Sequence, residues 1–376
     1  MNKPIYILAP MDDVTDTIFR RIVHDCSPPD LTMTEFVNVD GLCSVGRPRL
    51  MPKLKTDLDK TDVIAQIWGK NPDNFYAVAK ELSDGAIPGF VGIDLNFGCP
   101  AKSEVRAGCC SALQKPELRD EALAIIKATQ EGAAAGKNNL PVSFKTRLGY
   151  SVIDYTWHEF LLEQKPSMLS VHVRTTKQMS KVPAQWECIE EIVKLRDKIS
   201  PDTKIIMNGD IMNRAHGDEL TKRYGIDGVM IGRGVFHDPF CFSSQTRHQQ
   251  ACQYAEQTAP SASSDPANFS PPVLASSYKD TPGSVLQREN PHDLDVPSLC
   301  KCPGIWESKS RTEREAILIK HLTLHKETYP NDERKFNPVK KFAKLYISGF
   351  DGAAEFRNEL MNTESIDEML ELLKTK

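Results

Sequence analysis

The sequence predicts an α/β protein, a (β/α)8 TIM barrel followed by a small C-terminal helical domain. Three observations support this fold class. Eight short apolar runs of strand type alternate with helical patterns over roughly the first 240 residues. Polar residues or glycines end each run, and a helical pattern returns near the end of the chain after an irregular stretch. With 376 residues, the chain is long enough for a barrel and a smaller domain.

The predicted strands are separated by segments of helical character. The clearest helix covers residues 72–82, with Asn71 as its cap and a proline at its first position. Apolar residues at helical spacing predict further helices near 118–126, 183–199 and 214–224. The strands are expected to end near Leu8, Thr34, Ile67, Leu95, Lys145, His172, Asn208 and Ile231.

A doubly wound open sheet is the alternative fold. Such a sheet normally carries a glycine fingerprint after its first strand, where this chain has Ala9-Pro10-Met11-Asp12. The barrel is therefore the preferred interpretation.

Composition divides the chain into three parts. Residues 1–243 are the predicted barrel, residues 244–306 are an irregular insertion rich in Ser, Pro and Asp, and residues 307–376 are a helical domain. In the helical domain we expect one helix over 312–328 and a second that begins at Pro338. The sequence Ser365-Ile366-Asp367-Glu368 is a capping box that opens a last helix.

The bulk properties are those of an ordinary globular protein. The formal net charge of −4 argues mildly against a nucleic-acid partner, although it can hide a local basic patch. No apolar run reaches membrane-spanning length, and the strand-like start of the chain leads us to expect no presequence and no membrane partner. The ten cysteines lack the regular spacing of a disulfide scaffold. We expect a cytoplasmic monomer.

The carboxyl ends of the strands, where parallel barrels carry their chemistry, are polar in this chain. Gln66 and Lys145 could hydrogen-bond the carbonyls and nitrogens of a flat heteroaromatic ring. The glycine-rich ends of the last two strands, together with Arg233, match the place where such barrels often hold phosphate. A full ring of polar strand ends is hard to attribute to folding alone, so we expect a ligand there.

The segment 92–100, Gly-Ile-Asp-Leu-Asn-Phe-Gly-Cys-Pro, is the most informative strand end. It delivers Asn96 and Cys99 into a turn that Pro100 fixes. The Asn96 amide offers a donor and an acceptor to a base edge, and Cys99 can give or take a proton. A buried structural cysteine is the alternative for Cys99, but the other polar strand ends argue against it.

Together these motifs resemble those of the dihydrouridine synthases, flavin enzymes that reduce uridine in folded RNA. The resemblance covers residues 5–240, in the family's order, and a helical segment of the family's kind follows. The matching segments are Ala9-Pro10-Met11, Val14-Thr15-Asp16, Phe19-Arg20, Thr34-Glu35, Gln66-Ile67-Trp68-Gly69, Asp94-Leu95-Asn96-Phe97-Gly98-Cys99-Pro100, Lys145-Thr146-Arg147, His172-Val173-Arg174-Thr175, Asn208-Gly209-Asp210-Ile211 and Gly232-Arg233-Gly234. Each match alone is weak, whereas the set is specific.

The resemblance implies a bound FMN, with NADPH as a transient reductant. The reaction it implies is the FMN-dependent reduction of specific uridines in tRNA to dihydrouridine, and rRNA is the alternative substrate. Hydride would enter at C6 of the uracil and Cys99 would give the proton to C5. An unperturbed thiol has a pKa of about 8.5, so Cys99 would be mostly protonated near neutrality. Asn96, Lys145 and Arg147 would face the uracil. The flavin would be held by Pro10, Met11, Gln66, Lys145, His172, Asn208, Gly209, Asp210, Gly232 and Arg233.

Two basic clusters are candidate RNA contacts, because backbone phosphates bind Lys and Arg; from charge alone, a solvated face is an equally good interpretation. The first cluster precedes the third strand and contains Arg47, Arg49, Lys53 and Lys55. The second lies in the helical domain and contains Arg334, Lys335, Lys340, Lys341 and Lys344.

Three features depart from the family's pattern. Val173 stands where a glycine is usual. Cys109 and Cys110 follow the Cys99 turn, and we interpret them as packing cysteines rather than as a second reactive thiol. The third is the long insertion over residues 244–306. It contains the candidate metal ligands Cys252, Cys300 and Cys302, with His248, but their spacing is not a standard zinc pattern, so we predict no metal site there.

Two other functions stay open at this point. One is a flavin-dependent barrel oxidoreductase that acts on a small pyrimidine or enone, similar to dihydroorotate dehydrogenases or ene-reductases. The other is a non-catalytic RNA-binding protein that keeps a flavin as a structural ligand. The presence of Cys99 together with Lys145 and Arg147 argues against the second.

Overall fold

The strands form one closed parallel barrel. The computed structural model describes residues 3–244, 305–330 and 336–375. Its strands are β1 (Ile5–Leu8), β2 (Leu31–Met33), β3 (Val37–Asn38), β4 (Val63–Trp68), β5 (Phe90–Asn96), β6 (Val142–Arg147), β7 (Met168–His172), β8 (Lys204–Asn208) and β9 (Gly228–Ile231). Neighbours pair in the order β2-β1-β9-β8-β7-β6-β5-β4-β3, and a pairing of β2 with β4 closes the ring. Because β2 and β3 pair with opposite ends of β4, they share one position, and the barrel has eight. The predicted barrel is confirmed.

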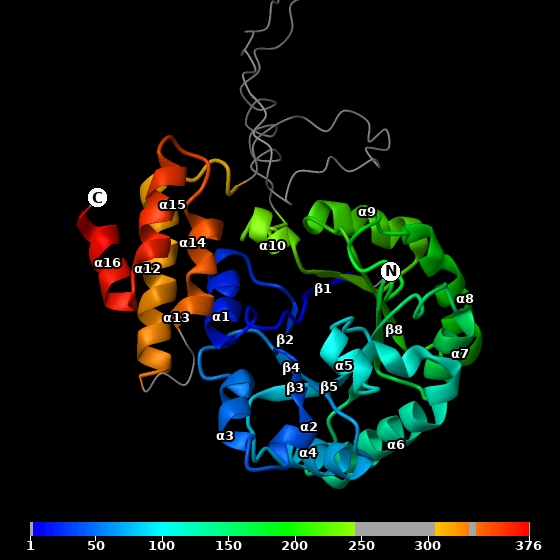
Figure 1. The fold of residues 1–376 in the computed structure, drawn as a ribbon. Coiled ribbons are helices and arrows are strands. Elements are labelled where there is room, and N and C mark those ends of the chain that lie inside the picture. Colours follow the sequence, from blue (N-terminus) through cyan, green and yellow to red (C-terminus); the bar gives the residue numbers. More distant parts are fainter. Residues whose placement is uncertain (1–2, 245–304, 331–335, 376) are drawn as a thin grey trace, which may run out of the picture. The chain divides into compact units, whose positions relative to one another are not determined.

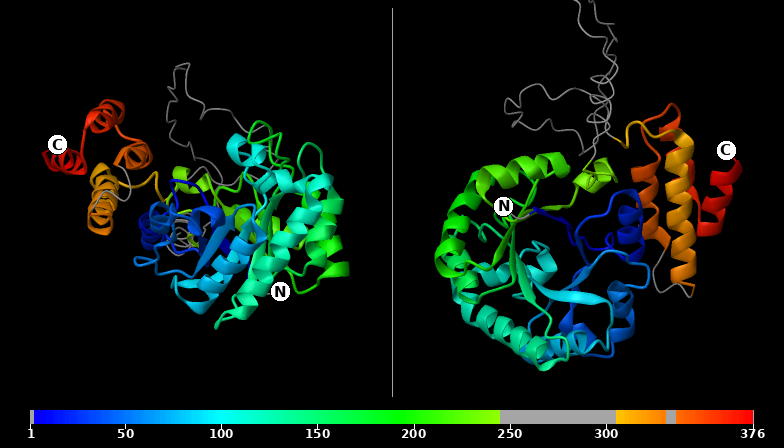
Figure 2. Two further views of the ribbon diagram at one scale, coloured as in Figure 1. Left: turned by 60° about the horizontal axis from the view of Figure 1, so that its bottom comes forward. Right: turned by 180° about the vertical axis from the view of Figure 1, so that it is seen from behind.

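Helices surround the barrel as an outer ring (Figure 1; Figure 2 gives the view from behind). In this part of the chain the helices are α1 (Thr17–Cys26), α2 (Val39–Leu42), α3 (Arg47–Leu50), α4 (Pro72–Asp84), α6 (Arg119–Ala135), α7 (Tyr155–Glu163), α8 (Ile189–Ile199), α9 (Arg214–Tyr224) and α10 (Gly234–His237). The short α5 (Lys102–Arg106) lies inside the ring in the view of Figure 1. Asn71 caps α4 as predicted, since its side chain accepts the N–H of Asp73.

Two predicted helix starts are wrong. The helix expected from residue 183 begins as α8 at Ile189, because the preceding residues bond to neighbouring loops: Ala184 N–H donates to the Asp210 carboxylate and Gln185 N–H to the carbonyl of Val173. The helix expected to begin at Pro338 is α13, which the structure describes over Phe336–Val339, so the chain is already helical two residues before the proline.

Alternation along the strands places apolar side chains both inside and outside the barrel. Tyr6 and Leu8 belong to the large outer core between strands and helices. A second buried cluster, made of intervening strand residues, fills the interior below the carboxyl ends of the strands: Ile7, Ala9, Met33, Ile64, Met168, Ile206 and Met230. The polar site lies above this apolar layer.

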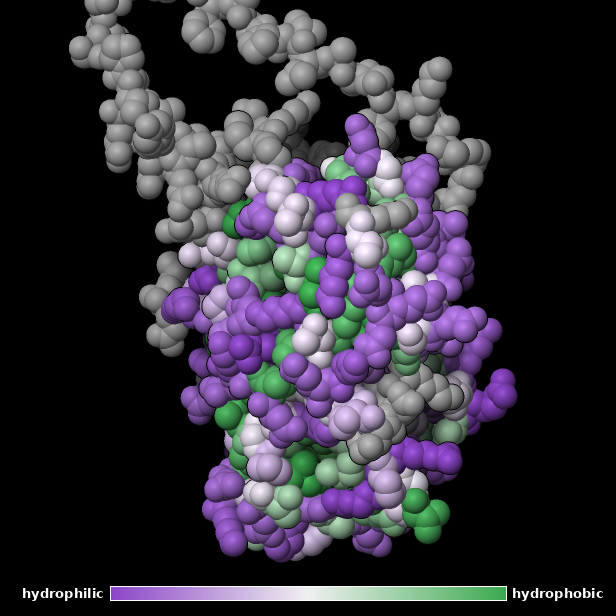
Figure 3. Space-filling model, turned by 90° about the vertical axis from the view of Figure 1, so that its left-hand side faces the viewer, coloured by the Kyte–Doolittle hydropathy of each residue, from purple (hydrophilic) through white to green (hydrophobic). Residues whose placement is uncertain are grey.

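The C-terminal helices pack on the barrel through α1. They are α12 (Arg311–Thr328), α13, α14 (Lys341–Tyr346), α15 (Ala353–Asn362) and α16 (Ile366–Thr375). The rings of Phe19 in α1 and Phe342 in α14 stack with centroids 5.2 Å apart, and His321 of α12 lies 4.2 Å from the same Phe342 ring. The face of this region shown in Figure 3 is mainly hydrophilic, with scattered apolar residues.

The caps of the C-terminal helices differ in part from the prediction. Ser310 and Glu313 form a full capping box at α12, which was not among the predicted caps. At α16, Ser365 accepts the N–H of Glu368 as predicted, but the Glu368 carboxylate accepts the N–H of Glu364 instead of that of Ser365. The described helices include none that is long and apolar enough to cross a bilayer. The predicted insertion lies, apart from its first and last residues, outside the described residues.

Candidate active site

The register of the strands brings most predicted site residues to one end of the barrel, which we call the rim. Asn96 lies opposite Lys145, and Arg147 lies opposite His172, which in turn lies opposite Asn208. Since all strands are parallel, these side chains meet at their carboxyl ends. The rim therefore contains residues from β5, β6, β7 and β8 in direct succession.

Asn96 shapes the turn that follows β5. Its Oδ1 accepts the N–H groups of Gly98 at 3.0 Å and Cys99 at 2.9 Å, while its Nδ2 donates to Gln66 Oε1 at 2.9 Å. One hydrogen of Nδ2 is left for a ligand. Asn96 thus holds Cys99 in place as well as lying near the expected position of a base.

A buried carboxylate completes this network, and it was not among the predicted site residues. Asp94 accepts from Gln66 Nε2 at 2.7 Å and from Ser143 Oγ at 2.6 Å. Burial raises the pKa of Asp94 to about 6, although both hydrogen bonds and the nearby Lys145 favour its charged form. Asp94 orients Gln66, whose Nε2 keeps a second hydrogen. A charged residue within the apolar run of β5 was the available signal.

Lys145 and Arg147 place positive charge at the rim. Lys145 Nζ donates to Asn208 Oδ1 at 3.4 Å, and burial, followed by the charge of Arg147, lowers its pKa to about 8. Arg147 is more constrained: Nε donates to the carbonyl of Gly98 at 2.8 Å, and Nη1 to the carbonyls of Thr175 and Met179. Its pKa falls to about 10, chiefly through burial, so it stays charged. Arg147 ties the Cys99 turn to the loop after β7.

Cys99 is half-buried. The pKa of its thiol departs from the ordinary value that the sequence led us to expect. A hydrogen bond with the Cys110 thiol lowers the pKa of Cys99, against the opposing effect of burial. Burial raises the pKa of Cys110 well above its ordinary value, so Cys110 is the donor. Cys110 is buried, as expected of a packing cysteine, but it also contacts the candidate acid. Cys109 is buried and directs its thiol toward the carbonyl of Ala107 instead.

His172 presents an orphaned polar atom at the rim. Its Nδ1 is buried, and the described residues offer it no hydrogen-bond partner. Burial, reinforced by the charges of Arg147 and Lys145, lowers the pKa of His172 well below its ordinary value, so the ring is neutral. A neutral imidazole can donate or accept one hydrogen bond at this atom, depending on its tautomer. An unpaired buried atom of this kind is costly unless a ligand satisfies it.

The ends of β8 and β9 form an open, positively charged corner. Asp210, whose φ is +52°, accepts from Arg174 and, at 2.6 Å, from Arg233 Nη2. Trp186 Nε1 donates to the carbonyl of Gly209 at 2.9 Å, a contact that the sequence did not reveal. A Cβ at Gly232 would meet only Ala9 and Met11, at ordinary contact distances of 3.5 and 3.9 Å. Gly232 and Met11 therefore lie side by side.

Val173, the departure from the expected glycine, is fully buried. A Cβ at Gly209 would lie 3.2 Å from Val173 Cγ2, so the valine packs under that glycine. Gly209 itself has a φ of +128°, which disfavours a side chain there.

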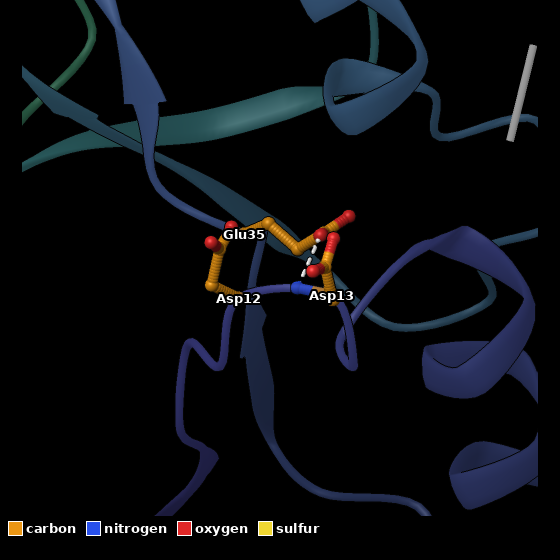
Figure 4. A group of neighbouring side chains, drawn as sticks. All are labelled: Asp12, Asp13 and Glu35. Carbon is orange, nitrogen blue, oxygen red and sulfur yellow. Dashed lines mark hydrogen bonds between the residues drawn. The ribbon is translucent and has the colours of Figure 1, made fainter. Parts of the chain in front are cut away.

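A second polar group lies beside the rim, after β1 and β2. The buried Glu35 carboxylate accepts the N–H of Asp13, and Asp12 lies next to it (Figure 4). Lys53 of the first basic cluster pairs with Asp12 and lies 3.8 Å from Glu35, while Lys341 of the second donates to the carbonyl of Asp13. The structure thus brings one lysine of each predicted cluster to the same turn.

The other members of the two basic clusters differ in whether their side chains bind within the chain or are exposed. Arg47 pairs with Glu81, Lys55 Nζ donates to the carbonyl of Thr328 at 2.9 Å, and Lys340 Nζ to that of Met361 at 3.2 Å. Arg49 and Lys344 are exposed. Arg334 and Lys335 lie outside the described residues, as do the four candidate zinc ligands of the insertion, Cys252, Cys300, Cys302 and His248.

Comparison with known proteins agrees with this geometry. A sequence model described as dihydrouridine synthase matches residues 7–267. A "Probable tRNA-dihydrouridine synthase" of Staphylococcus epidermidis is 38% identical over 380 residues, covering 100% of this chain and 94% of that protein. One of Staphylococcus aureus is 38% identical, over 99% of this chain and 93% of its own length. A "Probable tRNA-dihydrouridine synthase 2" of Bacillus subtilis is 35% identical, over 99% and 94%. The chain belongs to the dihydrouridine synthase family.

Proposed function

We propose that this enzyme reduces the 5,6 double bond of specific uridines in tRNA to dihydrouridine, with FMN as bound cofactor and NADPH as reductant. The observation that carries the proposal is the half-buried Cys99 thiol on the same rim as the Lys145 ammonium. An acid and a cation near one position are what the reduction of an enone-like ring requires. The names of the relatives support tRNA as the substrate.

The residues of the rim fit a flavin. The orphaned His172 Nδ1, the Lys145 ammonium and the free Nε2 hydrogen of Gln66 offer hydrogen bonds to a polar ring edge. Space beside Gly232 and the exposed Arg233 suit a phosphate. Pro10, Met11, Asn208, Gly209 and Asp210 border this region and complete the proposed flavin set. When bound and reduced, the flavin supplies a hydride to C6 of the uracil.

Side chains of the protein itself stabilise the negative charge that develops on the uracil and donate the proton. Negative charge develops at C5 and the C4 oxygen of the uracil, where the Lys145 ammonium stabilises it. Cys99 gives its proton to C5, and the hydrogen bond from Cys110 stabilises the thiolate that remains. Asn96 and Arg147 hold the turn that aims this thiol. The target nucleotide must leave its stack to reach the rim, at a cost of a few kcal/mol.

Basic side chains beside the rim support RNA binding, although Asp12 and Glu35 balance part of their charge. Lys53 and Lys341 meet at the Asp12–Asp13 turn, and the exposed Arg49 and Lys344 belong to the same two clusters. Phosphates that contact these side chains would make affinity strongly salt-dependent. The cytoplasmic location and the monomeric state stay predictions.

The test is a single-turnover reoxidation of the prereduced, flavin-loaded enzyme in the absence of oxygen. Unmodified tRNA should reoxidise the flavin rapidly, and mass spectrometry should find dihydrouridine in the product. Reoxidation by rRNA or by a free pyrimidine, but not by tRNA, would overturn the substrate assignment and keep the barrel chemistry. RNA binding without any reoxidation would point to a non-catalytic flavin protein.

A further inference from the structure

Two thiols meet beside the rim, and the reduction of uracil needs only one. Cys99 is half-buried and reachable, while Cys110 is 1% exposed and hydrogen-bonds to it. Their backbones also adjoin, because the N–H of Ser111 donates to the carbonyl of Cys99 at 3.3 Å. A disulfide requires two thiols on neighbouring backbones. The Ser111–Cys99 hydrogen bond brings the backbones together, and the interaction with Cys110 that lowers the pKa of Cys99 joins the two thiols.

The backbone at Cys110 does not favour a cysteine. Its φ of +52° lies in the left-handed region, where glycine carries no steric penalty and a residue with a Cβ does. Glycine would adopt this backbone conformation without the steric penalty. The chain holds a thiol here against that preference, in contact with the sulfur of Cys99.

We propose that Cys99 and Cys110 form a reversible oxidation site, at which a peroxide converts the two thiols into an intramolecular disulfide. The site itself does not depend on the proposed function; only its consequence, loss of the acid that protonates uracil, rests on it. The oxidised chain would be inactive until a dithiol reduces it.

The chemistry balances with peroxide as the oxidant. The thiolate of Cys99 attacks one peroxide oxygen, so that an S–O bond forms, the O–O bond breaks and the other oxygen leaves as water after taking a proton. The Cys110 sulfur then attacks the sulfenic sulfur of Cys99, the S–S bond forms and the hydroxyl leaves as water with the Cys110 proton. The two thiols lose two electrons and two protons, and the peroxide becomes two waters.

Cys99 is suited to the first step by its acidity. Among the seven cysteines that the structure describes, it is the one whose pKa is lowered; burial raises the pKa of the other six, Cys26, Cys43, Cys109, Cys110, Cys188 and Cys241. A larger thiolate fraction and partial exposure favour oxidation at Cys99.

The experiment oxidises the purified full-length protein with hydrogen peroxide, blocks the remaining thiols with N-ethylmaleimide and digests with trypsin. Cleavage at Lys102 and Arg106 separates the two cysteines, so the disulfide would join peptides 81–102 and 107–119. Peptide 107–119 also contains Cys109, which N-ethylmaleimide blocks. We therefore expect the joined pair to be lighter by two hydrogens than the sum of peptide 81–102 and the singly alkylated peptide 107–119. It should disappear after treatment with dithiothreitol.

Cys109→Ser and Cys110→Ser are the matched variants, because both cysteines are buried and adjacent but only Cys110 contacts Cys99. The joined pair should persist in Cys109→Ser and vanish in Cys110→Ser. If Cys110→Ser does not fold, Cys110→Gly, which suits the left-handed backbone, replaces it. Absence of the joined pair in the oxidised wild type, or its persistence without Cys110, would overturn the proposal whatever the enzyme's substrate is.

Discussion

At the scale of single residues, the Asp94 carboxyl makes stability depend on pH. Its pKa is about 6 in the folded chain, against an ordinary 3.8, so the folded state holds the proton more tightly than the unfolded state. The free energy of unfolding therefore falls as the pH rises from 3.8 through about 6. Asp94→Asn removes this dependence, and relative to wild type the variant should gain on the order of 3 kcal/mol between pH 3.5 and 7.

Urea unfolding of the two proteins at both pH values measures this effect. A constant offset between them reports only the altered hydrogen bonds to Gln66 and Ser143. If the offset does not change with pH, Asp94 has an ordinary pKa in the folded chain.

Cys99→Ala tests the proposed acid at the same scale. General acid catalysis by a positioned group is worth about 10²–10⁴-fold, so the rate of flavin reoxidation by tRNA should fall by that factor. The flavin content and tRNA affinity should not change, since the flavin contacts assigned above do not use this thiol. A variant that reduces uridine at the wild-type rate would remove Cys99 from the mechanism.

At the scale of elements, one buried ion pair fixes α1 to the segment before β4. Arg20 and Asp59 are joined at 2.6 and 2.8 Å, with side chains 0% and 6% exposed. Arg20→Ala leaves the Asp59 carboxylate buried without its partner and should cost about 3–5 kcal/mol of unfolding free energy. The neighbouring Arg21→Ala, which breaks the more exposed pair with Asp25, should cost less than about 1 kcal/mol. Equal losses in the two variants would contradict this account.

Boundaries of helices and strands were predicted well where they depend on periodicity and caps within a few residues. Boundaries that depend on contacts with distant parts of the chain were not predicted. The predicted strand ends lie within two residues of the observed ones, and the helix predicted over 214–224 matches α9, because periodicity and caps are local. Residues 183–188 carry a helical pattern but donate to the carbonyl of Val173 and to Asp210, which no local pattern reveals.

The same distinction holds for the site. The prediction that Lys145, His172 and Asn208 lie close together follows from the parallel barrel, since all its strands end at one rim, and the strand register agrees with it. Cys110 and Trp186 were missed as parts of the site, because their roles depend on contacts with Cys99 and Gly209 that the order of the sequence does not show.

At the scale of the whole molecule, one lysine from each of two basic clusters that lie far apart in the sequence reaches the same turn beside the rim. The double variant Lys341→Glu/Lys344→Glu should weaken tRNA binding and reduce the slope of log affinity against log salt by about 2, one unit for each phosphate that the variant no longer neutralises. Flavin content should not change. Lys222→Glu, a charge reversal at an exposed position of α9, is the control and should bind as wild type. Equal binding by all three proteins would exclude the C-terminal cluster from the RNA contact.

The stacked rings of Phe19 and Phe342 have a practical consequence for anyone who wishes to dissect this protein. A clone that stops after the barrel would expose the ring of Phe19 and the part of α1 that now contacts α12. Exposed patches of this kind drive aggregation. The C-terminal helices are therefore not a detachable module, and a barrel expressed without them should be recovered mainly from the insoluble fraction.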